Sequence, residues 1–328
     1  MNKIKNIGVL TSGGDAPGMN AAIRAVVRAG IYYDLKVTGI LRGFEGLVMG
    51  DFIDMDRKSV ANIIQRGGTI LKTARSESFR TPEGRKKAYD QLIANNIDAL
   101  VVIGGDGTFT GANVFIKEYN FPIIGLPGTI DNDLAGTDFT IGYDTAINTV
   151  INAVDKIRDT AESHNRLFIV EVMGRDSGLI ALRSGIGVGA EAILIPEAEK
   201  GMEDLITRLE HGRKDKASKI IIVAEGDEVG GGVFNIGEIL KDKFPGYDIR
   251  VSVLGHIQRG GSPSCMDRVL ASRLGVSAVE GLLNGHSGEM VGQINLEIAF
   301  TPFDQATKHI NIEEVGPAWL KLVEILSL

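Results

Sequence analysis

The chain has 328 residues, 44% of them hydrophobic, and a formal net charge of −7 at pH 7. This length predicts two domains, because one core seldom holds so many residues. A domain that grips nucleic acid through its phosphates is usually basic, so the acidic balance and the lack of a polybasic block argue against that class. We therefore expect a small ligand, held by local arginines within an acidic shell.

Cysteine content and hydropathy bear on the compartment. The chain has one cysteine, Cys265, which rules out an internal disulfide and fits a reducing compartment. Gly13, Gly14 and Asp15 interrupt any signal-like apolar core near the N-terminus. No stretch of the sequence approaches the length of a membrane span. These features predict a soluble cytoplasmic protein whose partners are neither nucleic acid nor membrane.

Strands are expected to alternate with helices almost throughout the chain. Apolar runs predict strands at residues 6–11, 100–103, 123–126, 167–172, 192–195, 219–224 and 249–254. Periodic patterns predict helices from the first glycine loop to about Ala29, over 145–161 and over 267–283. Asp15 is expected to cap the first helix, Pro17 to lie in its first turn, and Gly285 to end the last. This alternation favours α/β domains with doubly wound, mostly parallel sheets.

An acidic turn follows the strand expected at 123–126. The apolar run stops at Pro127 and Gly128, which typically end a strand and open a turn. Such a turn lies at the carboxyl edge of a sheet, where open α/β folds bind ligands. It would present Thr129, Asp131 and Asp133 to that crevice. The alternative is a capping loop, since either aspartate could cap the next helix.

Two glycine loops also follow predicted strands. The loop at residues 11–18 nearly matches a P-loop, but Met19 stands where the phosphate-binding lysine belongs. Its backbone amides could still hold phosphate at a helix start, and a plain turn is equally compatible with the pattern. The loop at 104–108 is more specific, because three glycines flank Asp106. A single carboxylate there could hold Mg²⁺ together with substrate phosphates, and this reading is favoured over a simple turn aspartate.

Several basic residues lie beside glycines at strand ends. Arg75, Arg175 and Arg259 are of this kind, and their guanidinium forks suit phosphate oxygens. Arg24 and Arg28 share one helix face, which is either a solvated face or a second anion site. His256 could donate to a ligand or to a loop backbone, and no His/Cys group has zinc-ligand spacing. Together these features favour phosphoryl transfer, which requires mainly positioning and electrostatic stabilisation.

Five motifs in this order resemble those of the bacterial-type ATP-dependent 6-phosphofructokinases. They are Thr-Ser-Gly-Gly-Asp-Ala-Pro-Gly-Met-Asn (11–20), Gly-Gly-Asp-Gly (104–107), Pro-Gly-Thr-Ile-Asp-Asn-Asp (127–133), Glu-Val-Met-Gly-Arg (171–175) and Gly-His-Ile-Gln-Arg-Gly-Gly (255–261). The resemblance runs from about Ile4 to Leu283 and is weak after about Thr301. It implies transfer of the ATP γ-phosphoryl group to the C1 hydroxyl of fructose 6-phosphate, giving fructose 1,6-bisphosphate and ADP in glycolysis.

The resemblance also assigns roles to matching positions. Asp131 would be the general base, Asp133 would assist near the metal, and Arg175 would stabilise charge on the transferring group. The residues implied in binding ATP are Gly13, Phe44, Arg75, Ser76, Gly105, Asp106, Gly107 and Thr108, with Asp106 on Mg²⁺. The residues implied in holding the sugar phosphate are Thr129, Ile130, Asp131, Met173, Gly174, Arg175, Glu225, His256, Ile257, Gln258 and Arg259.

Subunit contacts and regulation follow from the same resemblance. Arg166 and Arg250 would reach the sugar phosphate of the neighbouring subunit, which makes the protein a homotetramer. A nucleoside diphosphate would activate, and phosphoenolpyruvate inhibit, at a separate intersubunit site. The matching positions for that site are Arg24, Arg28, Arg57, Arg158, Gly189, Ala190, Glu191, Lys214 and Lys216. Asn62 and Ala217 depart from the family pattern, so the choice of effector stays open.

The expected division is into two interleaved, Rossmann-like, three-layer αβα domains. The larger ATP- and Mg²⁺-binding domain would take residues 1–142 and 257–306, and the smaller sugar-phosphate domain 143–256 and 307–328. Pyrophosphate-dependent relatives carry Asp at position 107 and Lys at position 128, so glycine at both predicts ATP as the donor. Less favoured alternatives are an NAD or lipid kinase, which shares only the 104–108 motif, and a sugar-phosphate sensor, which needs neither Asp131 nor Asp106.

Overall fold

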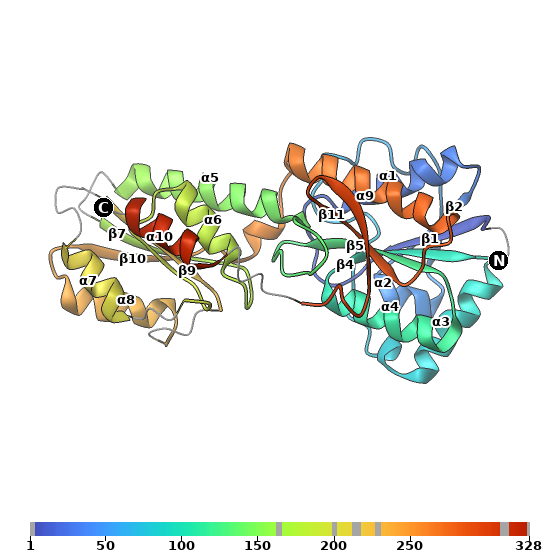
Figure 1. Cartoon of the computed structure of the whole chain (residues 1–328), viewed down its shortest axis with the longest axis horizontal. Coiled ribbons are helices and arrows are strands. Elements are labelled where there is room, and N and C mark those ends of the chain that lie inside the picture. The colour runs from blue at the N-terminus through green and yellow to red at the C-terminus, as the bar shows by residue number, and fades with distance from the viewer. Residues whose placement is uncertain are drawn as a thin grey trace. The chain divides into compact units, whose positions relative to one another are not determined.

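The computed structural model describes residues 4–161, 166–198, 202–211, 218–226, 231–308 and 315–326. The chain folds as two compact units. Unit 1 comprises Met1–Ile130, Leu134–Thr145 and Arg259–His309, and unit 2 comprises Asp131–Asp133, Ala146–Gln258 and Ile310–Leu328. Each unit is a mostly parallel sheet with helices on both faces (Figure 1), which confirms the predicted α/β fold class.

The sheet of unit 1 has the strand order β12-β11-β5-β4-β1-β2-β3, with the short β6 paired to β5. Its inner strands are parallel, whereas β3 and β12 run antiparallel to their neighbours. The central strands read as unbroken apolar runs because both faces are covered. The strands are β1 (Asn6–Thr11), β2 (Lys36–Ile40), β3 (Phe52–Met55), β4 (Ala99–Gly104), β5 (Ile123–Thr129), β6 (Ile141–Gly142), β11 (Glu289–Ile294) and β12 (Glu297–Pro302).

Helices α1 (Met19–Tyr32) and α9 (Cys265–Leu283) pack against each other on one face of this sheet (Figure 1). The other face carries α2 (Gly43–Met49), α3 (Pro82–Ala94) and α4 (Asp106–Tyr119), with the short 3₁₀ helix η1 (Ser78–Arg80) before α3. Large side chains from these helices and from β4 and β5 fill the core of this second layer, among them Phe109 and Phe115.

Unit 2 has a four-stranded parallel sheet in the order β10-β7-β9-β8. The strands are β7 (Arg166–Val172), β8 (Ala192–Leu194), β9 (Ser218–Ala224) and β10 (Asp248–Val253). One face carries α5 (Tyr143–Ala161), α6 (Leu179–Gly187) and α10 (Pro317–Leu326), and the other α7 (Met202–His211) and α8 (Val233–Lys243) (Figure 1). The 3₁₀ helix η3 (Gly255–Arg259) follows β10.

Two local expectations were wrong. Neither Asp15 nor Pro17 begins α1, because the helix starts at Met19 after Gly18, whose φ of 112° permits a left-handed cap without a side-chain hydrogen bond. Strand β5 does not stop at Pro127 and Gly128 but continues to Thr129. It continues because Gly128 and Thr129 pair with β6, a partner that is invisible from the local sequence. Gly285, with a φ of 90°, does follow α9 as expected.

Within the described residues, none of the helices is both long enough and apolar enough to cross a membrane.

Candidate functional site

Three neighbouring strands of unit 1 bring the predicted phosphate-binding loops together. β4 lies between β1 and β5, with Thr11 opposite Ile103 and Gly104 opposite Pro127. The first glycine loop, the second glycine loop and Thr129 therefore leave the same carboxyl edge of the sheet. A Cβ placed on Gly105 would lie 3.7 Å from the Cβ of Thr129, so the second loop packs directly against the start of the acidic turn.

The second glycine loop places Asp106 at the first residue of α4, directly after Gly105. The side chain is half-buried, and its Oδ1 accepts a hydrogen bond of 3.2 Å from the backbone N–H of Lys308. A Cβ at Gly107 would meet no atom within 4 Å. At Gly104, by contrast, a Cβ would collide with the hydroxyl of Thr108 and the carbonyl of Ser12. The loop thus needs glycine for packing on its inner side and leaves open space on its outer side.

The acidic turn is closed by hydrogen bonds behind it. The hydroxyl of Thr140 donates to the carbonyl of Thr129 at 2.7 Å, and Thr129 pairs with Gly142 through β5 and β6. Asp131 and Asp133 are largely buried, at 7% and 6% exposed. The next helix, α5, starts at Tyr143, which is ten residues after Asp133 along the chain.

Asp267 on α9 supplies a carboxylate to the backbone at the start of α5. Its two oxygens accept from the backbone N–H of Gly142 and of Thr145, each at 2.8 Å, and also from the Thr145 hydroxyl. Burial raises the pKa of Asp267, while these hydrogen bonds act in the opposite direction. Gly142 and Thr145, which follow the acidic turn in the chain, are thereby hydrogen-bonded to α9 within unit 1.

The segment that carries Arg75 and Ser76 lies on the α2 side of unit 1. The Ser76 hydroxyl donates to Glu45 at 2.7 Å, and the ring of Phe44 stacks on Phe79 with centroids 4.1 Å apart. Thr73 donates to the carbonyl of Gly13 at 2.7 Å, so this segment also borders the first glycine loop. The predicted nucleotide residues of unit 1 therefore lie around one edge.

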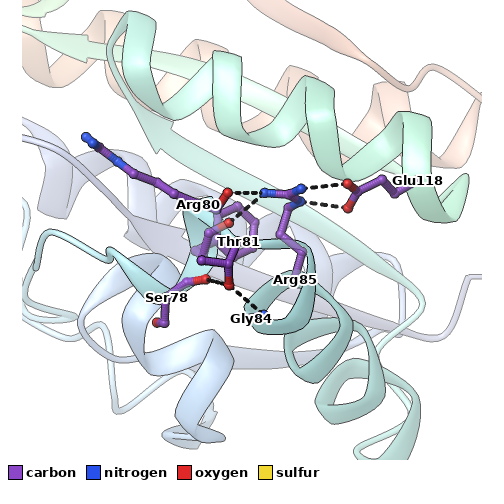
Figure 2. Close-up of polar contacts among 7 residues, drawn as sticks. Ser78, Arg80, Thr81, Gly84, Arg85 and Glu118 are labelled. Atoms are coloured by element: carbon purple, nitrogen blue, oxygen red, sulfur yellow. Dashed lines mark hydrogen bonds and ion pairs between the residues drawn. The ribbon is translucent and has the colours of Figure 1, made fainter.

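A partly buried ion pair between α3 and α4 lies next to η1, which follows this segment (Figure 2). Arg85 on α3 binds both carboxylate oxygens of Glu118 on α4, each at 2.7 Å. Its Nη1 donates to the carbonyls of Phe79 and Arg80, at 3.1 and 2.7 Å. One guanidinium thus joins α3, α4 and η1, and the Glu118 carboxylate holds the pKa of Arg85 above its usual value.

Of the residues expected to hold the sugar phosphate, unit 1 contains Thr129, Ile130 and Arg259. Nη1 of Arg259 donates to the carbonyl of Asp15 at 3.2 Å, and a Cβ on Gly14 would lie 2.7 Å from the same nitrogen. The sequence separates Arg259 from the first glycine loop by most of the chain, yet the fold places its guanidinium against that loop.

The carboxyl edge of unit 2 collects a second group of predicted residues. β7 lies between β10 and β9, so the segments after these three strands start side by side. Met173, Gly174 and Arg175 follow β7, Glu225 follows β9, and His256 follows β10. The Glu225 carboxylate accepts from the backbone N–H of Arg175 at 2.7 Å. Arg175 has a left-handed φ of 58° and an exposed side chain.

Arg166 and Arg250 do not join that edge. Arg166 is the first residue of β7 and Val172 its last, so the strand separates Arg166 from the carboxyl edge by about 20 Å at about 3.3 Å per residue. Arg250 is paired with Phe168 near the same amino-terminal end. The structure therefore divides the predicted sugar-phosphate residues of unit 2 into a carboxyl-edge group and an amino-end pair. Ile257 is exposed beside His256, and Gln258 is fully buried.

The predicted effector residues fall on both units. Arg24 and Arg28 lie on α1, and burial together with repulsion from Arg28 lowers the pKa of Arg24. Arg57 is exposed in unit 1. In unit 2, Arg158 donates to the carbonyl of Val188, directly before the Gly189–Ala190–Glu191 segment, and Glu191 accepts from the N–H of Ile220 at 2.6 Å. Lys214 and Lys216 lie outside the described residues.

A magnesium ion fits the surroundings of Asp106. Within the described ranges, no three His, Cys, Asp or Glu side chains gather closely enough to hold a metal by themselves. Mg²⁺ is commonly held by one or two carboxylates and completes its shell with water and substrate phosphate. Asp106 offers one such carboxylate beside the open space at Gly107.

Some residues at this site were missed by the sequence analysis. Phe79, Arg85, Asp248, Asp267 and Lys308 each contact a predicted site residue or its segment. Only Asp248 had a local signal, because it lies two positions before Arg250 and a strand places such residues on one face. The others depend on pairing between distant elements.

Comparison with known proteins places this geometry in context. The profile of the phosphofructokinase family matches residues 6–282. An ATP-dependent 6-phosphofructokinase of Cytophaga hutchinsonii is 58% identical over 313 residues, covering 95% of each chain. ATP-dependent 6-phosphofructokinase 1 of Thermus thermophilus is 52% identical over 326 residues, covering 99% of this chain and all of the relative. The solved phosphofructokinase of Saccharomyces cerevisiae superposes with a TM-score of 0.87 at 37% identity, over 98% of this chain and 50% of the yeast chain.

Proposed function

The chain belongs to the phosphofructokinase family, and from that membership we propose that it is an ATP-dependent 6-phosphofructokinase acting in the cytoplasm. It transfers the γ-phosphoryl group of ATP to the C1 hydroxyl of fructose 6-phosphate. The observation that carries the proposal is the shared carboxyl edge of β1, β4 and β5, where two glycine loops adjoin the acidic turn.

In this proposal the nucleotide phosphates lie along the two glycine loops. Backbone N–H groups at the start of α4 point toward negative charge, and the missing side chains let phosphate oxygens approach them. Asp106 holds the magnesium ion, which supplies positive charge to the phosphate oxygens when bound. Arg75 and Ser76 border the same loops from the α2 side.

Asp131 acts as the general base. Its carboxylate takes the proton of the sugar C1 hydroxyl as that oxygen forms a bond to the γ-phosphorus. The bond between this phosphorus and the β,γ-bridging oxygen breaks, and ADP leaves with that oxygen. Thr129 and Asp133 position the reacting groups, and Arg175 stabilises negative charge on the transferring phosphoryl group. The hydrogen bond from Thr140 and the anchoring of Gly142 to Asp267 hold the turn in place for this step.

The sugar contacts Met173, Gly174, Glu225, His256 and Arg259 of its own subunit. Arg166 and Arg250 serve the sugar phosphate of a neighbouring subunit in a homotetramer. The strand length between Arg166 and the carboxyl edge supports this division, because an arginine side chain cannot span about 20 Å. A nucleoside diphosphate as activator and phosphoenolpyruvate as inhibitor bind a separate site that includes Arg24, Arg28 and Arg158.

The two glycines that distinguish phosphoryl donors support ATP over pyrophosphate. A Cβ at Gly107 would project into open space, where an aspartate would crowd and repel the α-phosphate of ATP. At Gly128, a Cβ would already lie 3.0 Å from Ile103 and 3.1 Å from Met19. A lysine there, as a pyrophosphate enzyme would need, requires these core side chains to move.

The test is an assay coupled to fructose 1,6-bisphosphate formation, run with ATP and with pyrophosphate as donors. We expect turnover with ATP, fructose 6-phosphate and Mg²⁺ together, and none when any one is omitted. Turnover with pyrophosphate alone would transfer the assignment to the pyrophosphate-dependent enzymes. Tight sugar-phosphate binding without turnover would identify a sensor.

A further inference from the structure

Asp248 lies between the two arginines at the amino-terminal end of the unit 2 sheet. Asp248 is the first residue of β10 and Arg166 the first of β7, and the two are direct partners across the parallel strands. Arg250 follows Asp248 by two positions, so its side chain leaves the same face of the sheet. Strand register alone therefore places one carboxylate beside two guanidinium groups.

The contacts use both oxygens of the carboxylate. Oδ2 accepts from Nε of Arg166 at 3.0 Å and from Nη2 of Arg250 at 3.1 Å. Oδ1 lies 3.0 Å from Nε of Arg250. The arginines hold the pKa of Asp248 below its usual value, with the Arg166 hydrogen bond as the largest cause. The carboxylate is therefore ionised at neutral pH and forms a fixed bridge between the two cations.

The bridge leaves part of each guanidinium available to a ligand. Within the described chain, Nη2 of Arg166 and Nη1 of Arg250 make no hydrogen bond, and Nη1 of Arg166 reaches only the Thr160 hydroxyl, at 3.5 Å. Arg250 is 58% exposed in its side chain, compared with 22% for Arg166. Two free forks held side by side match the several oxygens of a phosphate ester.

We propose that Asp248 is a positioning residue for sugar-phosphate binding: it holds Arg166 and Arg250 in the orientation that receives the 6-phosphate. This inference rests on the proposed function, which makes the arginine pair a phosphate site. Asp248 does not touch the phosphate, since two anions would repel each other. It instead offsets the repulsion between the two cations and fixes their long side chains before the ligand arrives, which lowers the entropy lost on binding.

The experiment measures half-saturation by fructose 6-phosphate for the wild type and for Asp248→Ala, Asp248→Asn and Asp248→Glu. We expect Asp248→Ala to raise the half-saturating concentration about tenfold, which is the scale of a lost charge-assisted hydrogen bond. The kcat and the KM for ATP should stay within about twofold, because phosphate positioning at the sugar does not touch the nucleotide. Equilibrium binding of fructose 6-phosphate, followed by calorimetry without ATP, should show the same loss.

The two conservative variants separate the parts of the role. Asn has the same shape but lacks the charge and turns one acceptor into a donor that faces an arginine, so it should behave like Ala. Glu keeps both acceptor oxygens and the charge, so it should recover at least half of the lost affinity. Asp204→Ala is the matched control, because Asp204 pairs with Arg208 at 2.7 Å in the same unit with similar exposure, 37% against 43%. It should leave sugar-phosphate affinity unchanged.

Three outcomes would overturn the inference. Unchanged affinity in Asp248→Ala, with Arg166→Ala still impaired, would show that the arginines need no bridge. Tighter binding in Asp248→Ala would show that the carboxylate competes with the phosphate. An equal loss of kcat, ATP binding and thermal stability would indicate a purely structural residue. Failure of the proposed function itself looks different, since the wild type would then neither bind nor phosphorylate fructose 6-phosphate.

Discussion

The carboxyl edges of the two sheets differ in whether they present backbone groups or side chains. In unit 1 the edge consists largely of glycine backbone: at Gly13 the positive φ disfavours a side chain, and at Gly104 close packing excludes one. In unit 2 it consists of side chains, namely Arg175, Glu225 and His256, each delivered by the end of a different strand. A chain of phosphates presents similar oxygens along its length and suits repeated backbone donors. A sugar presents distinct hydroxyls and requires individually placed groups.

This difference has a consequence for mutation. In unit 1, a side chain added at one of these glycines should impair folding where the space is filled. Where the added atoms point into open space, it should impair mainly ligand binding. In unit 2, removal of one side chain should remove only the contacts of that group and leave the fold intact. The acidic turn belongs to both patterns, because Thr129 pairs as a strand residue while Asp131 is the proposed general base.

The largest effect is expected at that turn. Asp131→Asn keeps the shape of the side chain but removes the proton acceptor, so kcat should fall by about 10²- to 10⁴-fold, the range for loss of a general base. The half-saturating concentration of fructose 6-phosphate should change little, because the lost interaction develops in the transition state. The coupled assay and calorimetry measure the two quantities. An unchanged kcat would remove Asp131 from this role.

The backbone edge is tested at Gly107. Because a Cβ there meets open space, Gly107→Asp should fold normally, yet it should raise the KM for ATP by about 10- to 100-fold through repulsion of the phosphates. Gly107→Asn has nearly the same volume without the charge and serves as the matched control, with a smaller increase. Equal effects of Asp and Asn would show that crowding, and not charge, decides donor binding.

The next prediction concerns the ion pair between Arg85 and Glu118, which contacts η1 (Figure 2). Arg85→Ala leaves Glu118 without its bidentate partner and frees the carbonyls of Phe79 and Arg80. Breaking a buried pair costs about 3–5 kcal/mol, and the partial exposure of Glu118, at 31%, reduces this to about 2–3 kcal/mol. Denaturant unfolding should show that loss, and the KM for ATP should rise several-fold.

The neighbouring pair on the same helix is the control for Arg85. Lys86 binds Asp90 at the surface, with both side chains more than half exposed. Lys86→Ala should change the free energy of unfolding by less than about 1 kcal/mol, as is typical of exposed pairs. If Arg85→Ala changed the free energy of unfolding as little as Lys86→Ala, the Arg85–Glu118 ion pair would not stabilise this part of unit 1.

The sequence sufficed for features that are contiguous. The strands, the two glycine loops and the acidic turn are each written in one stretch, and the fold class follows from their alternation. The sequence could not predict contacts between residues that lie far apart along the chain. Asp267 anchors Thr145 from 122 positions away, and Asp248 meets Arg166 across 82 positions. The end of β5 was misplaced for the same reason, because its last pair depends on β6.

The smallest expected effect concerns the cation pair Arg24 and Arg28 on α1. Within the described chain, neither Arg24 nor Arg28 forms an ion pair, and the second cation helps lower the pKa of the first. Two uncompensated cations on one helix face repel each other, so the arrangement favours an anionic ligand. Arg28→Ala should raise the activating concentration of a nucleoside diphosphate several-fold and leave the unregulated rate within about twofold.

The same substitution relieves repulsion, so the free energy of unfolding should change by no more than about 0.5 kcal/mol. Lys36→Ala is the control, because Lys36 is a surface cation of the same unit that is already paired with Asp54 at 2.9 Å. It should leave the effector response intact. Titration of the rate with the nucleoside diphosphate and with phosphoenolpyruvate measures both variants. A reduced basal rate with a normal effector response in Arg28→Ala would place the anion site elsewhere, because an arginine that only binds an effector contributes nothing when the effector is absent.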